Sequence, residues 1–153
     1  MNDKVVISNL DTIKHIHAVR ELLYKMIDNL DERARLHDQS KFESPEQEIF
    51  GEHFEKLAST EYGTPEYDAL LEKVKPAITH HYANNRHHPE HWTNGIDDMT
   101  LLDLVEMLCD WKAATLRNKN GNIQKSIEKN AERFKFTPQL RQVFENTVRE
   151  MFQ

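Results

Sequence analysis

The chain has 153 residues and a mass of 18.1 kDa, the size of one ordinary domain. Four glycines and five prolines are few for this length, and this scarcity disfavours turn-rich β architectures and flexible linkers. The formal net charge of −6 argues against a domain that grips double-stranded nucleic acid through its phosphates.

Apolar periodicity predicts two helices in the first part of the chain. Asn9 or Asp11 can cap the first, and apolar residues at i, i+3, i+4 and i+7 continue it to Leu30. Asp31 is the predicted cap of a short second helix that ends between residues 42 and 44.

Three Ser-Pro or Thr-Pro pairs predict the starts of later helices, because the hydroxyl can cap the helix and proline suits its first position. The pairs are Ser44-Pro45, Thr64-Pro65 and Thr137-Pro138. Pro76 lies inside the helix that follows the second pair and marks a kink or a break.

A long irregular segment precedes the most apolar helix. Residues 87–99 contain Pro, Asn-Gly and paired Asp and are predicted as a loop. Asp98 or Thr100 then caps a helix to about residue 116. A turn over residues 118–122, a helix over 122–134 and the last helix complete an all-α single-domain bundle of six or seven helices over residues 1–153.

The sequence also predicts where the protein works. Its one cysteine, Cys109, excludes an internal disulfide and suits a reducing compartment. No apolar run approaches the roughly 18 residues that span a bilayer, and the start lacks the pattern of a signal peptide. We therefore expect a soluble cytoplasmic protein with no membrane partner.

Histidine density indicates a metal site. Five of the nine histidines fall within twelve positions: His80, His81, His87, His88 and His91. Imidazole with carboxylates is a ligand set for Zn, Fe, Mn or Co, and a single cysteine excludes a thiolate site. His80 and His87 are seven residues, or two helical turns, apart, and so are His81 and His88. The sequence leaves open which of His80 and His81 pairs with which of His87 and His88.

Other candidate ligands are spread along the chain. The neighbours His37 and Asp38 can offer one nitrogen and one carboxylate to the same ion, and that carboxylate can bridge a second ion. Lys41 follows His37 by four residues, so its ammonium is expected near the metal, where it can hold a phosphate oxygen. Asp110 lies in an apolar helix and needs a partner there. His15 lies one position before Ile16, which belongs to the apolar face of its helix, so its side chain could point into the core of a bundle.

The order of these residues, H…HD…H…H…D, resembles the HD-domain superfamily of helical metal-dependent phosphohydrolases. The segments KHIHAV, HDQSKF, NNRHHPEHW and EMLCDWKAA look closest to a small uncharacterised HD-like family of phages and bacteria. The resemblance covers about residues 11–115 and implies a metal-site core there, with residues 122–152 as additional C-terminal helices. It also implies the cytoplasm of a host if the chain is phage-encoded.

The resemblance implies one or two divalent transition metals, of identity Fe, Mn, Zn or Co. One ion would be bound by His15, His37, Asp38 and Asp110. A second would share Asp38 and add His81 with His87 or His88. The chain has Gly95-Ile96-Asp97 where the cyclic-di-nucleotide phosphodiesterase branch has Gly-Tyr-Pro, so that specificity is not carried over.

The leading functional hypothesis is hydrolysis of a phosphorylated small molecule, a nucleotide or related phosphate ester, by metal-activated water. Asp38 and Lys41 are the expected catalytic residues. The same ligands also fit a di-iron oxygenase, since some relatives of the superfamily bridge two irons through the HD aspartate. A third hypothesis is a non-catalytic module that binds a nucleotide or a protein. Homo-oligomerisation is left open.

Overall fold

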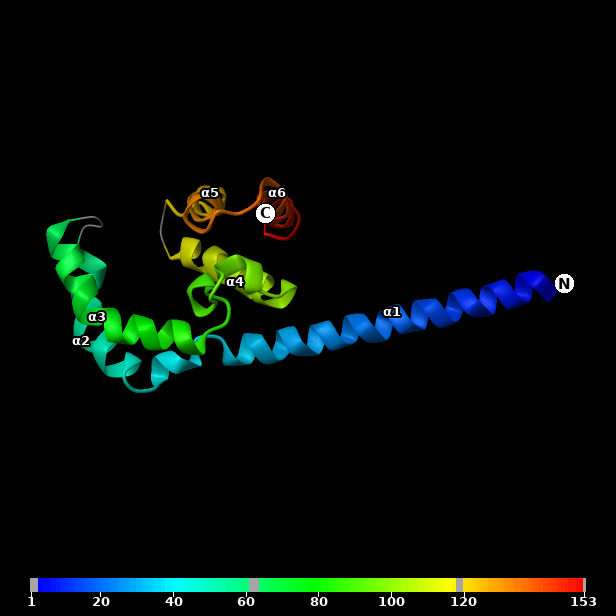
Figure 1. The fold of residues 1–153 in the computed structure, drawn as a ribbon, viewed down its shortest axis with the longest axis horizontal. Helices are drawn as coiled ribbons and strands as arrows, with labels where there is room; N and C mark the ends of the chain where they lie inside the picture. Colours follow the sequence, from blue (N-terminus) through cyan, green and yellow to red (C-terminus); the bar gives the residue numbers. More distant parts are fainter. Residues whose placement is uncertain (1–2, 61–63, 118–119, 153) are drawn as a thin grey trace. The chain divides into compact units, whose positions relative to one another are not determined.

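The computed structural model describes residues 3–60, 64–117 and 120–152. Within these ranges the chain forms six α-helices and three short 3₁₀ helices and has no strand, which confirms the predicted all-α class (Figure 1). The chain divides into two compact units, residues 1–36 and residues 37–153. None of the helices in the described ranges is long and apolar enough to cross a membrane.

The first unit is one helix, α1, Asp3–Leu36. The prediction that the chain breaks at Asp31 and starts a second helix there is wrong. No Pro or Gly interrupts this stretch, and Asp31 acts within the helix instead of capping a new one, because its Oδ2 accepts a hydrogen bond from Arg35 Nε at 3.2 Å. The predicted apolar stripe and His15 both lie on α1.

The second unit begins with η1, Gln39–Phe42, followed by α2, Glu46–Ser59, and α3, Pro65–Asn84. Helices α2 and α3 pack side by side (Figure 1). Thr64 caps α3 as predicted, since its Oγ1 accepts from the Tyr67 amide at 3.2 Å.

The helix start predicted at Ser44-Pro45 has a different cap, and the break that Pro76 could have caused is absent. At the start of α2 the N-cap residue is Pro45, and no side chain caps the helix, so Ser44 does not have the predicted capping role. Pro76 lies inside α3 without ending it. The first residue to leave α3 is therefore Asn85, close to the histidine cluster.

The segment predicted as a loop before the apolar helix contains two 3₁₀ turns, η2 (Pro89–His91) and η3 (Gly95–Asp98). The apolar helix is α4, Leu101–Leu116, and a capping box starts it. Thr100 and Asp103 exchange side-chain and backbone hydrogen bonds there. Asp103 is fully buried and is also paired with Arg86 at 3.2 Å, which ties α4 to the chain just after α3.

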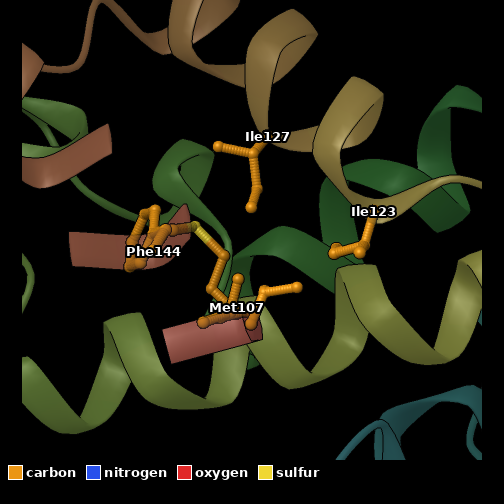
Figure 2. Close-up of a cluster of buried hydrophobic side chains, with 6 residues drawn as sticks. Met107, Ile123, Ile127 and Phe144 are labelled. Atoms are coloured by element: carbon orange, nitrogen blue, oxygen red, sulfur yellow. The ribbon is translucent and has the colours of Figure 1, made fainter. Parts of the chain in front are cut away.

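Helices α5, Ile123–Phe134, and α6, Pro138–Met151, start where predicted. Helix α5 packs against both α4 and α6, and side chains of all three helices share one core. Figure 2 shows the core that these three helices enclose. Gly121, one residue before the N-cap of α5, lies so close to the Thr115 backbone that a Cβ atom there would overlap it. Two residues of the predicted turn, 118 and 119, lie outside the described ranges. The core consists of Met107, Leu108, Ile123, Ile127, Phe144 and Val148.

Candidate metal centre

His37 and Asp38 lie in the turn that precedes η1, and not on a helix as predicted. Asp38 is the N-cap of η1 and has a positive φ of 58°, a left-handed conformation that Asp tolerates better than most residues. Lys41 follows in η1, and its Nζ donates to Asp38 Oδ2 at 2.6 Å. The turn, and not a helix face, brings the ammonium to the HD pair.

The histidines of the second cluster come from the end of α3 and the turn after it. Because α3 ends at Asn84, His81 is on the helix whereas His87 and His88 are beyond it, in the segment predicted as a loop. The spacing of two helical turns therefore does not place His81 and His88 on one helix face. The chain reverses instead, and His81 Nε2 lies 2.9 Å from His88 Nε2. His81, His87 and His88 therefore gather in one place, although two of them lie outside the helix.

A hydrogen bond holds η1 against the end of α3. The Asn85 side chain is buried, and its Nδ2 donates to Ser40 Oγ at 2.7 Å. This contact places Asp38 beside the histidines: its Oδ1 lies 3.4 Å from His81 Nε2 and 3.5 Å from His87 Nε2.

Three groups of potential ligand atoms result, and within each the atoms lie within 4.8 Å of one another. One consists of His37, His87 and Glu106, and the other two, called the first and second ligand groups, meet at Asp38. Asp38 belongs to both. Its Oδ1 faces the histidine cluster, while its Oδ2 lies 3.5 Å from His37 Nε2. His37 Nε2 in turn lies 3.8 Å from Asp110 Oδ1. The first group is His37, Asp38 and Asp110; the second is Asp38, His81, His87 and His88.

Two glutamates that sequence reasoning did not place in the site support these ligands. Glu46 is fully buried at the start of α2 and accepts hydrogen bonds from His80 Nδ1 and His81 Nδ1, each at 2.8 Å. It lies more than thirty positions from both histidines, so nothing in the local sequence indicated the contact. His80 therefore contacts Glu46, and it is in neither ligand group.

Glu106 is the other glutamate, and it lies one helical turn before Asp110 on α4. Its Oε1 is 3.0 Å from His37 Nδ1 and 3.1 Å from His87 Nδ1. The one-turn spacing to Asp110 was the available sequence signal. Because the glutamates engage the Nδ1 atoms of these rings, the Nε2 atoms are left to face Asp38.

The carboxylates of the site are held ionised. Burial acts to raise the pKa of Asp38, but the hydrogen bond and charge of Lys41 outweigh it and lower that pKa below its usual value. Burial likewise opposes ionisation of Asp110, and its contact with His37 lowers its pKa. In the opposite sense, Asp110, followed by Glu106, raises the pKa of His37 to about 10.

Two histidines of the second ligand group, His81 and His88, are held neutral. Burial, followed by the charge of Lys41, lowers the pKa of His81. Burial, followed by the neighbouring His87 and His81, lowers the pKa of His88 to about 3. Neutral imidazole is the form that binds metal ions, so these two rings are ready to act as ligands at neutral pH.

Two atoms at the centre of the cluster make the structural case for a cation. Asp38 Oδ1 and His87 Nε2 are buried and have no hydrogen-bond partner among the described residues. A buried polar atom without a partner is costly, and a divalent ion between these two atoms would satisfy both. The imidazole and carboxylate donors fit Zn, Fe, Mn or Co.

His15 is the remaining predicted ligand. It lies on α1, in the N-terminal unit, whereas every member of the two ligand groups belongs to the second unit. Its assignment as a ligand stays a prediction.

Comparison with known families places the chain in a group. Residues 6–150 match the sequence model of one protein family, which is described as a family of unknown function. The chain belongs to DUF5662. No curated protein and no solved structure matches it. In this DUF5662 chain, both ligand groups and both supporting glutamates lie inside the matched region.

Proposed function

We propose that this DUF5662 chain is a metal-dependent phosphohydrolase that acts on a nucleotide or a related phosphate ester. The observation that carries the proposal is the position of Asp38 between two ligand groups, with its two oxygens facing different histidines. A carboxylate placed in this way can bridge two ions. The ordered resemblance to HD-domain phosphohydrolases supports the same assignment.

The residues divide the work as follows. His37, Asp38 and Asp110 would hold one ion, and Asp38 would share a second with His81, His87 and His88. Divalent ions bound there supply a water of lowered pKa and a Lewis acid for phosphate.

Lys41 provides the contact to substrate. Its side chain is 43% exposed while Nζ lies 2.6 Å from Asp38 Oδ2, so the ammonium stands at the edge of the centre and is accessible from solvent. An ammonium in this position can bind a nonbridging phosphate oxygen and stabilise the charge that develops on it during hydrolysis. Asp38 keeps the ammonium oriented toward the ligand groups.

Phosphate release from nucleoside mono-, di- and triphosphates and from phosphodiesters tests the proposal, with protein loaded separately with Mn²⁺, Co²⁺, Fe²⁺ and Zn²⁺. Lys41→Met is expected to lower kcat/KM by about 100-fold while the protein retains its metal. Lys56→Met, an exposed lysine at the end of α2, is the matched control and should leave kcat/KM unchanged.

The result that would contradict the proposal is metal-loaded protein that hydrolyses no member of the panel. Purification with iron, together with oxygen consumption, would instead favour the oxygenase hypothesis.

A further inference from the structure

Glu106 touches both halves of the candidate metal centre. Its Oε1 lies 3.0 Å from His37 Nδ1, in the group with Asp110, and 3.1 Å from His87 Nδ1, in the group with His81 and His88. The two rings it contacts are adjacent, with centroids 4.4 Å apart. The Glu106 side chain is only 14% exposed, so little water competes for its carboxylate.

This contact determines which nitrogen each ring presents. A histidine that donates its Nδ1–H to a carboxylate presents its Nε2 to a metal, and the carboxylate makes that nitrogen more basic. The Nε2 atoms of His37 and His87 both face Asp38, at 3.5 Å from one or the other of its oxygens. One carboxylate oxygen thus orients a ligand of each ion position.

Glu46 has the same type of contact but serves only one half. Its carboxylate accepts from His81 Nδ1, a member of the second group, and from His80, which belongs to neither. Glu46 and Glu106 come from different helices, α2 and α4. Glu106 therefore contacts ligands of both ion positions, whereas Glu46 contacts a ligand of only one. Metal binding by variants of the two glutamates can measure this difference.

We propose that Glu106 is a positioning residue that couples the two ion positions, whereas Glu46 positions a ligand of the second ion alone. The inference rests on the metal centre of the proposed function and concerns two glutamates that lie outside the two ligand groups at Asp38. Loss of the Glu106 charge weakens binding of both ions, and loss of the Glu46 charge weakens one.

Calorimetric titration of the full chain with Co²⁺ tests the coupling. Glu106→Gln is expected to weaken both binding steps by about 10- to 100-fold, and Glu46→Gln only one of them, because orienting carboxylates typically contribute this much to affinity. Glu48→Gln, an exposed acid in the first turn of α2, is the control and should bind as the wild type does.

Nitrogen NMR of the metal-free protein gives a second readout that a merely structural role would not produce. His81 and His87 are expected to carry their protons on Nδ1 in the wild type. Glu106→Gln should change the tautomer signature of His87 and leave that of His81, and Glu46→Gln should do the reverse. If Glu106→Gln does not fold, Glu106→Asp, with its carboxylate drawn back by one methylene, should show the same loss in both binding steps.

The coupling is overturned if a folded Glu106→Gln protein binds both ions normally, or if its loss is confined to one step. It is also overturned if the wild type binds a single ion or none. Two-ion binding with the expected variant pattern, but without hydrolysis of any phosphate ester, would support the coupling and refute the proposed activity.

Discussion

Binding of a divalent ion at the His37 position should release one proton, which comes from His37 itself. Asp110, followed by Glu106, raises the pKa of His37 to about 10, so its ring carries two protons at neutral pH in the metal-free protein. The ion must displace the proton on Nε2. The pKa shifts of Asp38 and Asp110 leave those carboxylates ionised already.

The size of the effect follows from the pKa. At a pH about three units below it, the protonated ring outnumbers the neutral ring about a thousandfold. Affinity at this position is reduced by about the same factor and should rise about tenfold per pH unit until the pH reaches the pKa of His37.

Isothermal titration calorimetry in two buffers of different ionisation enthalpy counts the released protons. The expected count is about one for this ion. His37→Gln should abolish the release along with binding at this position, whereas His17→Gln, an exposed histidine of α1, should leave both unchanged. Binding without proton release, and with an affinity independent of pH, would refute the reasoning.

Three further predictions concern stability. In the metal-free protein the pKa of His37 in the folded state is raised from 6.5 to about 10. The contribution of His37 to the free energy of unfolding is therefore complete below pH 6.5 and is lost as the pH rises to about 10. Urea unfolding across this pH range measures the loss. Gly121→Ala should lower the free energy of unfolding by about 1–3 kcal/mol, because its Cβ would overlap the Thr115 backbone. Gly51→Ala, in open space within α2, should raise it by about 0.5–1 kcal/mol. Equal effects of the two substitutions would contradict the close contact at Gly121. Met107→Ala, in the core, should cost about 2–5 kcal/mol, and exposed Met151→Ala less than about 0.5 kcal/mol by the same assay, so a small loss at Met107 would argue against the packing.

Local capping signals predicted some helix starts correctly, but the signal at Ser44 did not produce a cap on α2. Thr64 and Thr100 cap their helices as expected, since a hydroxyl three residues before an amide forms the same hydrogen bond in many contexts. Asp31 carries a similar signal but lies within a continuous helix, where it pairs with Arg35. A capping residue alone therefore does not end a helix when the flanking residues continue to favour it.

The sequence predicted which residues are candidate ligands, but not how these residues are arranged in space. The family resemblance implied one set of four ligands, His15, His37, Asp38 and Asp110, and the structure brings the last three together. The sequence indicated that residues 87–99 would form a loop, but not that this loop would turn back and bring His88 beside His81. Nor did it indicate Glu46, because contacts between segments far apart in sequence depend on packing that no local pattern records.

The metal content of the purified protein tests the central claim most directly. Protein prepared without chelator or histidine tag should contain about two transition-metal ions per chain. Asp38→Ala should lose them, while Asp97→Ala, an exposed aspartate of η3, should keep them. Wild-type protein that holds no divalent ion, even after reconstitution, would contradict the account.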